Sequence, residues 1–486
     1  MLIKPEFHDF DDCSRTPAAG FLASLFLIVS LTACAARNVG PINEFAPDPG
    51  QPSRSLQADF ADDDTLVIGL AFSGGGTRAA AFAYGVLAEL DAVEVGQHTL
   101  TSNVRIVSGA SGGAVLAAYF GLRGPDQFQD FRERFLTENV EKSLHTSLGS
   151  PPNLIRAFRG GMNDRDRFAK WLNDNLFDGA TYADLYRDHA MLVWLNATDI
   201  HYGQPFLFTR ETFAALCSNL DSVRLADAVA ASAAFPVAFL PIEVMSYGSA
   251  CEQEVPEWQT RALEDPRAIV RLTAHARTLA AYRSYEEPTR VRLLDGGITD
   301  NIGITGLELT RASADTPYGP LSARQAVRFE NLLFIATDAG KTAKPDWATR
   351  EQVPSLVQIG PALANATVAA SVRKGFDALQ LTLADWQEDI IRFRCGLSDE
   401  QVLELRGSLE GWDCTNVNIT AQILSFRDLD ADQRRQLDEI PTRLALPVGQ
   451  VDLLIQAGRD TVRRNVAIQQ VLESVRQPAT SASSPD

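Results

Sequence analysis

The sequence predicts an α/β fold in which a mostly parallel central sheet lies between two layers of helices. Short, almost wholly apolar runs recur along the chain, and helix-forming segments follow the first two of them. A strand that is apolar on both faces belongs in a sheet covered on both sides, and alternation of such strands with helices is typical of parallel sheets. With 45% hydrophobic and 22% charged residues over 486 positions, the composition is that of a folded globular protein.

Two strand-to-helix units open the predicted sheet. Residues 66–72 (LVIGLAF) are predicted as a buried strand, and the alanine-rich residues 77–90 as the helix that follows. Residues 104–107 and 114–122 repeat this order around a turn of small residues. Further strands are expected at residues 191–195, 291–294 and 332–336.

The rest of the chain is predicted as helical or irregular. Residues 124–190 are polar with periodic apolar positions, which predicts helices laid over the edge of the sheet. From about residue 353 the pattern predicts a mainly helical region, and the Ser-, Ala- and Pro-rich end predicts a frayed tail. The predicted organisation is a signal peptide at 1–33, a lipidated tether at 34–64, a main domain at 65–345, a helical C-terminal region at 346–476 and a flexible tail at 477–486.

The charge balance argues against nucleic acid as a partner. The chain has 44 Lys plus Arg against 62 Asp plus Glu, which gives a formal net charge of −18. Binding to a phosphate backbone depends on clustered positive charge. The sequence also lacks a long basic run that could hold it on an anionic membrane, so membrane attachment needs another cause.

The N-terminal segment offers that cause. Residues 21–33 (FLASLFLIVSLTA) are too few to span a bilayer as a helix but match the apolar region of a signal peptide. They end in the sequence LTAC, which resembles the lipobox of bacterial lipoproteins and implies cleavage before Cys34 and lipidation of its thiol. Ala35 is not the Asp that retains lipoproteins at an inner membrane. We therefore expect an exported protein, lipid-anchored to the bacterial envelope at the outer membrane.

The residues before the apolar run fit a signal peptide less well. They carry Lys4 and Arg15 among several acidic residues, whereas a basic segment is expected there. A translation start further downstream would leave Arg15 as the positive charge. An ordinary apolar segment with a chance cysteine is the alternative.

The remaining cysteines permit disulfides. Cys217, Cys251, Cys395 and Cys414 are an even set in a chain expected to be exported, and pairing of sequence neighbours would give Cys217–Cys251 and Cys395–Cys414. Other pairings and free buried thiols stay open. None of these cysteines has the spacing of a zinc site, so no metal is expected.

A GASGG motif at residues 109–113 lies between a predicted strand and a predicted helix. This is the G-x-S-x-G pattern in the strand–turn–helix context of a nucleophile elbow. Gly109 and Gly113 suit a sharp turn that pushes the Ser111 hydroxyl out beside a helix N-terminus. Ser111 is therefore the candidate nucleophile, and an ordinary tight turn is the alternative.

An SGGGTR motif at residues 73–78 follows the first predicted strand. Gly74, Gly75 and Gly76 leave backbone amides open to a cavity, as an oxyanion hole requires. A phosphate-binding loop is the rival interpretation. It lacks the lysine of a P-loop, and Ala79 stands where a dinucleotide fingerprint has its last glycine.

Asp295 closes the predicted strand at 291–294 and is followed by two glycines. A carboxylate at the C-terminal end of a strand lies where α/β folds bind ligands. An aspartate that only starts a turn is the alternative. None of the histidines lies in a strand-end motif; His201 is the best candidate for a histidine base, with a structural role as its alternative.

The order GGGTR, GxSxG and DGG resembles the patatin-like phospholipases. Further landmarks are GVL at 85–87, NATD at 196–199, ASAAFP at 231–236 and DGGITDN at 295–301. The resemblance covers about residues 65–340. It implies a three-layer α/β fold and a lipid acyl hydrolase, a serine esterase that needs neither a cofactor nor a metal ion.

The resemblance also implies roles for the three motifs. Ser111 and Asp295 would form a catalytic dyad without histidine, the Gly75 and Gly76 amides would hold the oxyanion, and Arg78 would brace their loop. A carboxylate is a weak base in water, so we expect Asp295 to be partly desolvated, which raises its pKa.

Two positions depart from the family's pattern. Ala79 stands in place of a glycine, and Ser73 stands where plant members carry aspartate. Both flank the expected oxyanion hole, so we expect changed geometry and not lost activity. The implied partners are a lipid or lysophospholipid substrate and a membrane reached through the lipid anchor. A catalytically silent lipid-binding scaffold is the alternative function.

Overall fold

The computed structural model describes residues 38–48, 65–95, 98–145, 153, 156–157, 161–186, 191–250, 254–341 and 355–476. The predicted signal peptide at 1–33, the lipidation site Cys34 and the predicted tail at 477–486 lie outside the described residues. Within the described residues, none of the helices is long and apolar enough to span a bilayer.

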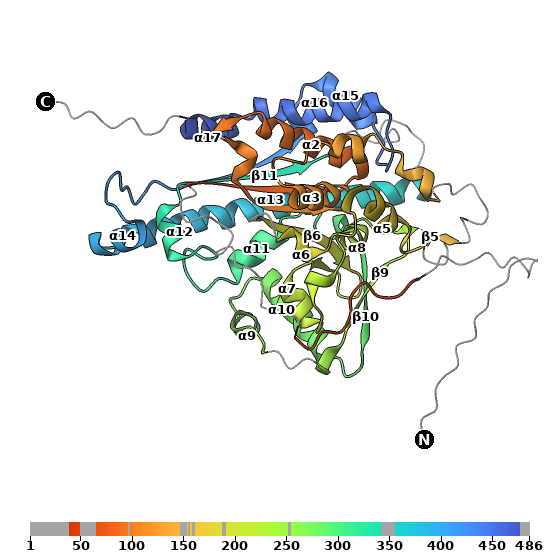
Figure 1. The fold of residues 1–486 in the computed structure, drawn as a ribbon, viewed down its shortest axis with the longest axis horizontal. Helices are drawn as coiled ribbons and strands as arrows, with labels where there is room; N and C mark the ends of the chain where they lie inside the picture. Colours follow the sequence, from red (N-terminus) through yellow and green to blue (C-terminus); the bar gives the residue numbers. More distant parts are fainter. Residues whose placement is uncertain are drawn as a thin grey trace, which may run out of the picture. The chain divides into compact units, whose positions relative to one another are not determined.

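A central sheet runs in the order β12-β11-β1-β4-β6-β10-β9, with β7 paired to β6 (Figure 1). Five neighbouring strands are parallel, which confirms the predicted α/β fold with a mostly parallel sheet. Strands β7, β9 and β10 join it in antiparallel fashion. The parallel strands are β1 (Leu66–Phe72), β4 (Val104–Ala110), β6 (Leu192–Asp199), β11 (Asn331–Asp338) and β12 (Asn418–Ser425), and the others are β7 (Gln204–Leu207), β9 (Ile242–Ser246) and β10 (Thr289–Asp295).

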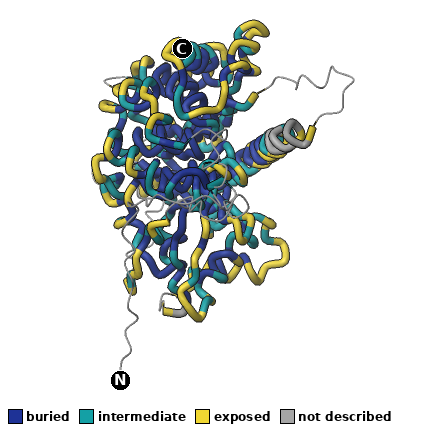
Figure 2. Tube along the Cα trace, turned by 90° about the vertical axis from the view of Figure 1, so that its right-hand side faces the viewer, coloured by how far each residue is buried: buried dark blue, intermediate teal, exposed yellow. Residues whose placement is uncertain are grey.

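Helices cover both faces of this sheet, and each face has its own apolar core. On one face pack α2 (Gly76–Asp91), α3 (Gly112–Arg123) and α8 (Leu225–Ser232), together with helices from the C-terminal region. The other face is covered by α11 (Thr305–Ala312), α12 (Ala323–Arg328) and α13 (Leu356–Cys395). Figure 2 shows buried residues through the interior and exposed residues on the outer turns. The fold is therefore the expected three-layer arrangement.

The predicted helices at 124–190 are short and mixed in the structure. They comprise two π-helical turns, η2 (Arg132–Leu136) and η4 (Asn173–Phe177), the 3₁₀ turn η3 (Val140–Ser143), α5 (Arg167–Leu172) and α6 (Tyr182–Leu185). A strand that the sequence did not predict, β5 (Gly161–Asn163), pairs with β8 (Val237–Phe239). The remaining elements are β2 (Glu94–Val95), β3 (His98–Thr99), α7 (Arg210–Ala215), α9 (Glu257–Glu264), α10 (Val270–Ser284) and the 3₁₀ turns Leu100–Asn103, Leu220–Ser222, Gly248–Ala250, Gly296–Ile298 and Phe426–Asp428.

The C-terminal region is mainly helical, but it also supplies a strand. Its helices are α14 (Asp399–Arg406), α15 (Ala431–Glu439), α16 (Val448–Arg464) and α17 (Val466–Arg476), besides α13. Strand β12 extends the sheet next to β11. The sequence did not predict β12, because only two of its eight residues are buried and it lacks a continuous apolar run. The region thus shares the sheet of the main domain.

One predicted disulfide is present among the described residues. Cys395, at the end of α13, is bonded to Cys414. Cys217 is also disulfide-bonded, and its predicted partner Cys251 lies outside the described residues.

Candidate active site

Ser111 stands on a strained turn between β4 and α3. Its backbone has φ 53° and ψ −120°, an uncommon conformation for a residue other than glycine. The glycines that follow allow a close approach to the β1–α2 loop: a Cβ on Gly112 would lie 2.1 Å from the Gly76 carbonyl oxygen, and one on Gly113 would lie 2.3 Å from that of Phe72. Gly109 is equally crowded, because its Cβ would lie 2.6 Å from the Gly113 carbonyl oxygen. The turn has the conformation expected of a nucleophile elbow.

The structure brings Ser111 and Asp295 together. Ser111 Oγ donates to Asp295 Oδ2 at 2.7 Å, and Gly297 N donates to Oδ1 at 2.8 Å. Both side chains belong to buried residues, 8% exposed for Ser111 and 6% for Asp295. The Asp295 backbone is fixed as well, because its amide donates to the Ala234 carbonyl at 3.0 Å and its carbonyl accepts from Thr198 Oγ1 at 2.8 Å.

Asp295 reaches this place by a different route from the one the sequence suggested. Its strand, β10, is antiparallel to β6, so strand direction alone does not place Asp295 beside the carboxyl ends of the parallel strands. Asp295 instead pairs with Ala197 of β6, one position beyond Asn196, which pairs with Ala110 of β4. Strand β10 therefore stops level with the end of β4. Register, and not a common strand direction, brings the carboxylate to Ser111.

Burial makes Asp295 a stronger base. Desolvation raises the pKa of its carboxyl to about 6, while the hydrogen bonds from Ser111 and Gly297 act in the opposite direction. The desolvation expected from the sequence is therefore confirmed. A carboxylate with a pKa near 6 is ionised at neutral pH and accepts a proton more readily than an exposed one.

The glycine loop lies against the nucleophile, since a Cβ on Gly74 would be 3.3 Å from Ser111 Cβ. Gly75 and Gly76 have φ values of 137° and 62°, which side chains disfavour. In the part of the chain that the structure describes, the amides of Gly75 and Gly76 donate no hydrogen bond. Within the glycine loop, these two amides are therefore free to bind a ligand.

Gly74 and Arg78, also assigned to the oxyanion hole, have other partners. The Gly74 amide donates to the Asn301 carbonyl at 2.9 Å, so in this structure it is not open to an oxyanion. Arg78 is buried, and its Nη1 donates to the Ile440 carbonyl at 3.1 Å. Burial lowers the pKa of Arg78 to about 10, against the opposing effect of Asp338 and Asp438. Arg78 thus joins the loop to the C-terminal region.

Two hydroxyls that the sequence left without a role support the dyad. Ser232 Oγ accepts from the Ser111 amide at 2.9 Å and donates to the Asn196 carbonyl at 2.6 Å. Thr198 Oγ1, besides donating to Asp295, lies 2.8 Å from Thr299 Oγ1. The ASAAFP and NATD stretches contain these residues, and the stretches were the only signal available. Their hydrogen bonds fix the two backbones that carry the dyad.

His201 takes no part in this arrangement. It is exposed in the turn after β6, where its amide donates to Asp199 Oδ1 at 2.8 Å and its ring lies edge-on to Tyr202. Among the described residues, no hydrogen bond joins its ring to Ser111 or Asp295. The structure therefore gives no support to a histidine base at this position.

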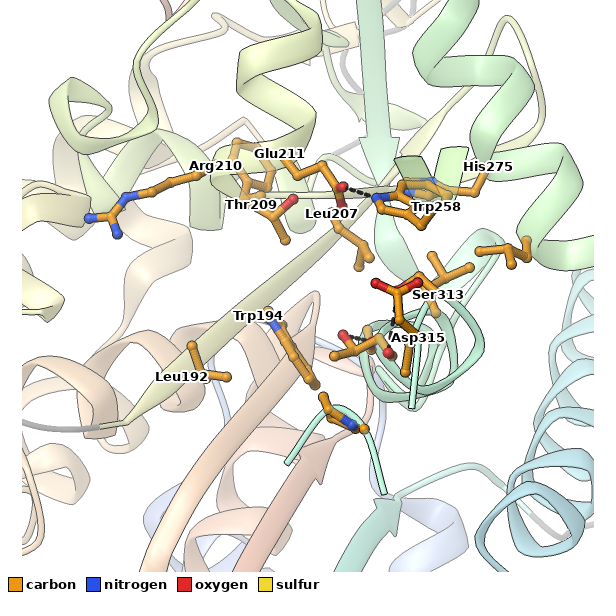
Figure 3. Close-up of a pocket in the computed structure, with 18 of the residues that line it drawn as sticks. Leu192, Trp194, Leu207, Thr209, Arg210, Glu211, Trp258, His275, Ser313 and Asp315 are labelled. Atoms are coloured by element: carbon orange, nitrogen blue, oxygen red, sulfur yellow. Dashed lines mark hydrogen bonds between the residues drawn. The ribbon is translucent and has the colours of Figure 1, made fainter. Parts of the chain in front are cut away.

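A cavity of about 370 Å³ lies elsewhere, between β6, α7, α9, α10 and α11. Figure 3 shows Trp258 stacked on His275 and donating to the Glu211 carboxylate, at 2.5 Å, with Trp194 on the opposite wall. Burial lowers the pKa of His275 to about 4, so this histidine is neutral at physiological pH. The lining includes neither the dyad nor the glycine loop, so this cavity is separate from the candidate active site.

The fold and these three loops define a class of protein, a serine esterase of α/β architecture. The model of the family described as patatin-like phospholipase matches residues 70–307. By sequence, residues 70–307 are thus a patatin-like phospholipase domain, which confirms the resemblance found in the motifs.

Solved structures with a similar chain path come from human and bacterial proteins. Human GIVD cytosolic phospholipase A2 is 12% identical with a TM-score of 0.44, over 87% of this chain and 65% of that chain. VipD from Legionella pneumophila is 14% identical with a TM-score of 0.33, over 85% of this chain and 67% of that chain. The match thus spans about two thirds of each of those chains. No curated protein matches the sequence.

Proposed function

We propose that this protein hydrolyses fatty-acyl esters of lipids through a Ser111–Asp295 dyad and an acyl-enzyme. The hydrogen bond of 2.7 Å between Ser111 Oγ and a buried Asp295 carboxylate carries the proposal. It joins a hydroxyl on a nucleophile elbow to a carboxylate whose pKa is raised toward the working range of a general base. Membership in the patatin-like family supports lipid esters as the substrate class.

In the acylation step, Asp295 Oδ2 accepts the Ser111 proton while Ser111 Oγ forms a bond to the ester carbonyl carbon. The carbonyl oxygen becomes an oxyanion, which the Gly75 and Gly76 amides, without a hydrogen-bond partner among the described residues, would stabilise. When the intermediate collapses, the ester C–O bond breaks and the leaving alcohol takes the proton from Asp295. The acyl group remains on Ser111.

Deacylation repeats these steps with water as the nucleophile. Asp295 accepts a proton from the water as its oxygen bonds to the acyl carbon, and Ser111 regains a proton as the acyl–serine bond breaks. The products are a fatty acid and the original enzyme. The mechanism needs one group that accepts the proton and later returns it, and Asp295 Oδ2 already accepts a hydrogen bond from the Ser111 hydroxyl.

Labelling with a fluorophosphonate probe tests the proposal. The wild type should be labelled on Ser111, whereas Ser111→Ala and Asp295→Asn should lose labelling and His201→Ala should keep it. Mass spectrometry of a mixed lipid extract treated with wild type or Ser111→Ala would then identify the ester that is cut. If the wild type is not labelled, the esterase proposal is wrong and the alternative, a catalytically silent lipid-binding scaffold, takes its place.

We further propose that the mature protein is anchored by lipid on Cys34 and faces its substrate at the bacterial outer membrane. The support is sequence alone: the apolar run at 21–33, the LTAC motif and Ala35 after the cysteine. An alkyne fatty acid supplied to cells should label the wild type and fail to label Cys34→Ala. Equal labelling of both proteins, or soluble wild-type protein after fractionation, would contradict the anchor.

A further inference from the structure

A segment between α15 and α16 crosses the start of α2. We call residues 440–446 (IPTRLAL) the strap. Two of its main-chain carbonyls accept hydrogen bonds from residues that follow the glycine loop: Arg443 O from the Thr77 amide at 2.8 Å, and Ile440 O from Arg78 Nη1 at 3.1 Å. A Cβ on Gly76 would lie 2.5 Å from Arg443 O, so strap and loop are packed without a gap. The strap therefore packs directly against the glycine loop.

Glu141 fastens the strap from the other side. The carboxylate of Glu141, in η3, accepts from Arg443 Nε at 3.1 Å, from Arg443 Nη2 at 2.5 Å and from the Leu444 amide at 3.1 Å. The Glu141 side chain is only 13% exposed, against 55% for Arg443. Charge-assisted, two-pronged bonds of this kind are the stronger hydrogen bonds of proteins. They fix the residue whose carbonyl holds the Thr77 amide.

Helix α2 depends on this external contact because it begins without a side-chain cap. Its N-cap is Gly75, which has no side chain, and its first turn contains no acidic residue. The amides of a first helical turn have no partner within the helix. The strap satisfies the Thr77 amide and leaves those of Gly75 and Gly76 open. The strap therefore supplies the partner of one first-turn amide and not of the other two.

We propose that Glu141 is a positioning residue, which through the strap fixes the direction of the Gly75 and Gly76 amides at the oxyanion site. This inference rests on the proposed function, because it needs an oxyanion to form beside Ser111. It assigns part of the active-site geometry to residues 440–446, outside the family match at 70–307. Glu141 and Arg443 need not touch the substrate for this role.

Release of the strap should lower kcat and leave substrate binding unchanged. Loss of one oxyanion donor typically costs about 10²–10³ in kcat, so a donor that is only misdirected should cost about 10- to 100-fold. The oxyanion exists only near the transition state, so KM should stay within about twofold.

The experiment compares Glu141→Ala, Arg443→Ala and the conservative Arg443→Lys with a matched control. The control is Arg435→Ala in α15, which removes the same charge from a side chain that is 76% exposed and, among the described residues, is paired with Asp432. Two readouts are needed: kcat and KM on a chromogenic fatty-acyl ester, and hydrogen exchange of the backbone over residues 74–80 by mass spectrometry.

We expect a 10- to 100-fold lower kcat and faster exchange at Thr77 in Glu141→Ala and Arg443→Ala, at nearly constant KM. Arg443→Lys should recover part of both effects, and Arg435→Ala should match the wild type. Wild-type kcat in both alanine variants, or unchanged exchange at Thr77, would overturn the proposal.

The test still decides if Glu141→Ala does not fold or if the wild type proves unreactive. If Glu141→Ala fails to fold, the exposed Arg443 side chain still allows Arg443→Ala and Arg443→Lys to be compared with the control. If the wild type fails to react with a fluorophosphonate, the proposed function falls and the oxyanion role of Glu141 falls with it. Low kcat confined to the strap variants, with a fully reactive wild type, supports both.

Discussion

The catalytic loops and the C-terminal region contribute to this protein in opposite ways. The loops at Ser111, Asp295 and the glycines act through side chains and amides at short range, and each is shaped by its own turn. The C-terminal region touches the site through two main-chain carbonyls of the strap. Elsewhere its α16 packs against α2, its β12 extends the sheet, and its α13 covers the other face of the sheet. The reacting groups thus lie in the main domain, and the C-terminal region adds contacts that hold one of their loops in place.

The contact between α2 and α16 shows how closely the two regions fit (Figure 1). A Cβ on Gly85 would lie 2.1 Å from the Ile455 carbonyl oxygen, and one on Gly458 would lie 2.2 Å from that of Phe82. Small residues on both helices let their backbones touch. The comparison therefore predicts that changes in the catalytic loops alter rate, whereas changes in the C-terminal packing away from the strap alter stability.

Ser111→Ala should have the largest effect and tests the first half of the comparison. We expect ester hydrolysis to fall by about 10⁴-fold or more, because the nucleophile is lost. The melting temperature should change little, since one hydroxyl is removed and the backbone turn is retained. Steady-state kinetics and thermal unfolding check this. A residual rate within tenfold of wild type would show that Ser111 is not the nucleophile.

Gly458→Ala should unfold the protein more readily without altering the chemistry. The new methyl group collides with the Phe82 carbonyl, so the free energy of unfolding should fall by about 3 kcal/mol. The rate per folded molecule should stay at the wild-type level. Denaturant unfolding with active-site titration separates the two quantities.

Gly449→Ala is the matched control in the same helix. Nothing lies within 4 Å of its Cβ position, so alanine should stabilise α16 by about 0.5–1 kcal/mol. Equal effects of the two substitutions would contradict the close packing of α16 on α2.

Removal of the Cys395–Cys414 bond should also affect stability alone. The bond closes a loop with a sequence separation of 19, so Cys395→Ser with Cys414→Ser should lower the free energy of unfolding by about 2–3 kcal/mol. Thermal unfolding with and without reductant measures the loss of stability. The double variant lacks this bond, so reductant should not destabilise it by breaking the bond. A fall in kcat at temperatures where the variant is folded would break the proposed separation of regions.

Ionisation of Asp295 should raise the rate of hydrolysis and lower the stability of the folded protein. The pKa of its carboxyl is about 6 in the folded protein against 3.8 for an ordinary one, so the folded state keeps its proton to higher pH. Between these values the unfolded chain binds fewer protons, and the free energy of unfolding falls as pH rises. Ionised Asp295 therefore destabilises the fold, although its ionised form is the base.

Asp295→Asn should accordingly abolish hydrolysis. It should also raise the free energy of unfolding at pH 8 by about 1–2 kcal/mol, which is part of the free energy that corresponds to the pKa shift. The gain should vanish below about pH 4. In the wild type, kcat/KM should rise with pH through about 6. Melting curves and rates from pH 4 to 9 test both statements. A flat profile of kcat/KM across pH 6 would exclude Asp295 as the base.

The catalytic motifs could be predicted because each has a local cause. A turn that exposes a serine or a row of amides requires residues without side chains, so glycines mark it in the sequence. The apolar strands β1, β4, β6 and β11 were predictable for a similar reason, because burial on both faces leaves a continuous apolar run.

Other features had no local cause and were missed. Strand β12 is partly polar because it forms the edge of the sheet, and the antiparallel direction of β10 depends on its neighbours. The roles of Ser232 and Arg443 lie in what they contact from distant parts of the chain. Such contacts depend on packing, which no short stretch of sequence encodes.

The order of residues was enough to predict the α/β class, the nucleophile candidate Ser111 and the carboxylate Asp295, since turns that need residues without side chains are marked by glycines. The folded chain was needed to show that the Gly74 amide is occupied, that Asp295 lies on an antiparallel strand, and that a strap from beyond residue 430 packs over α2. The physical reason is that hydrogen-bond partners and register are set between segments far apart, once the sheet and both helical layers have packed.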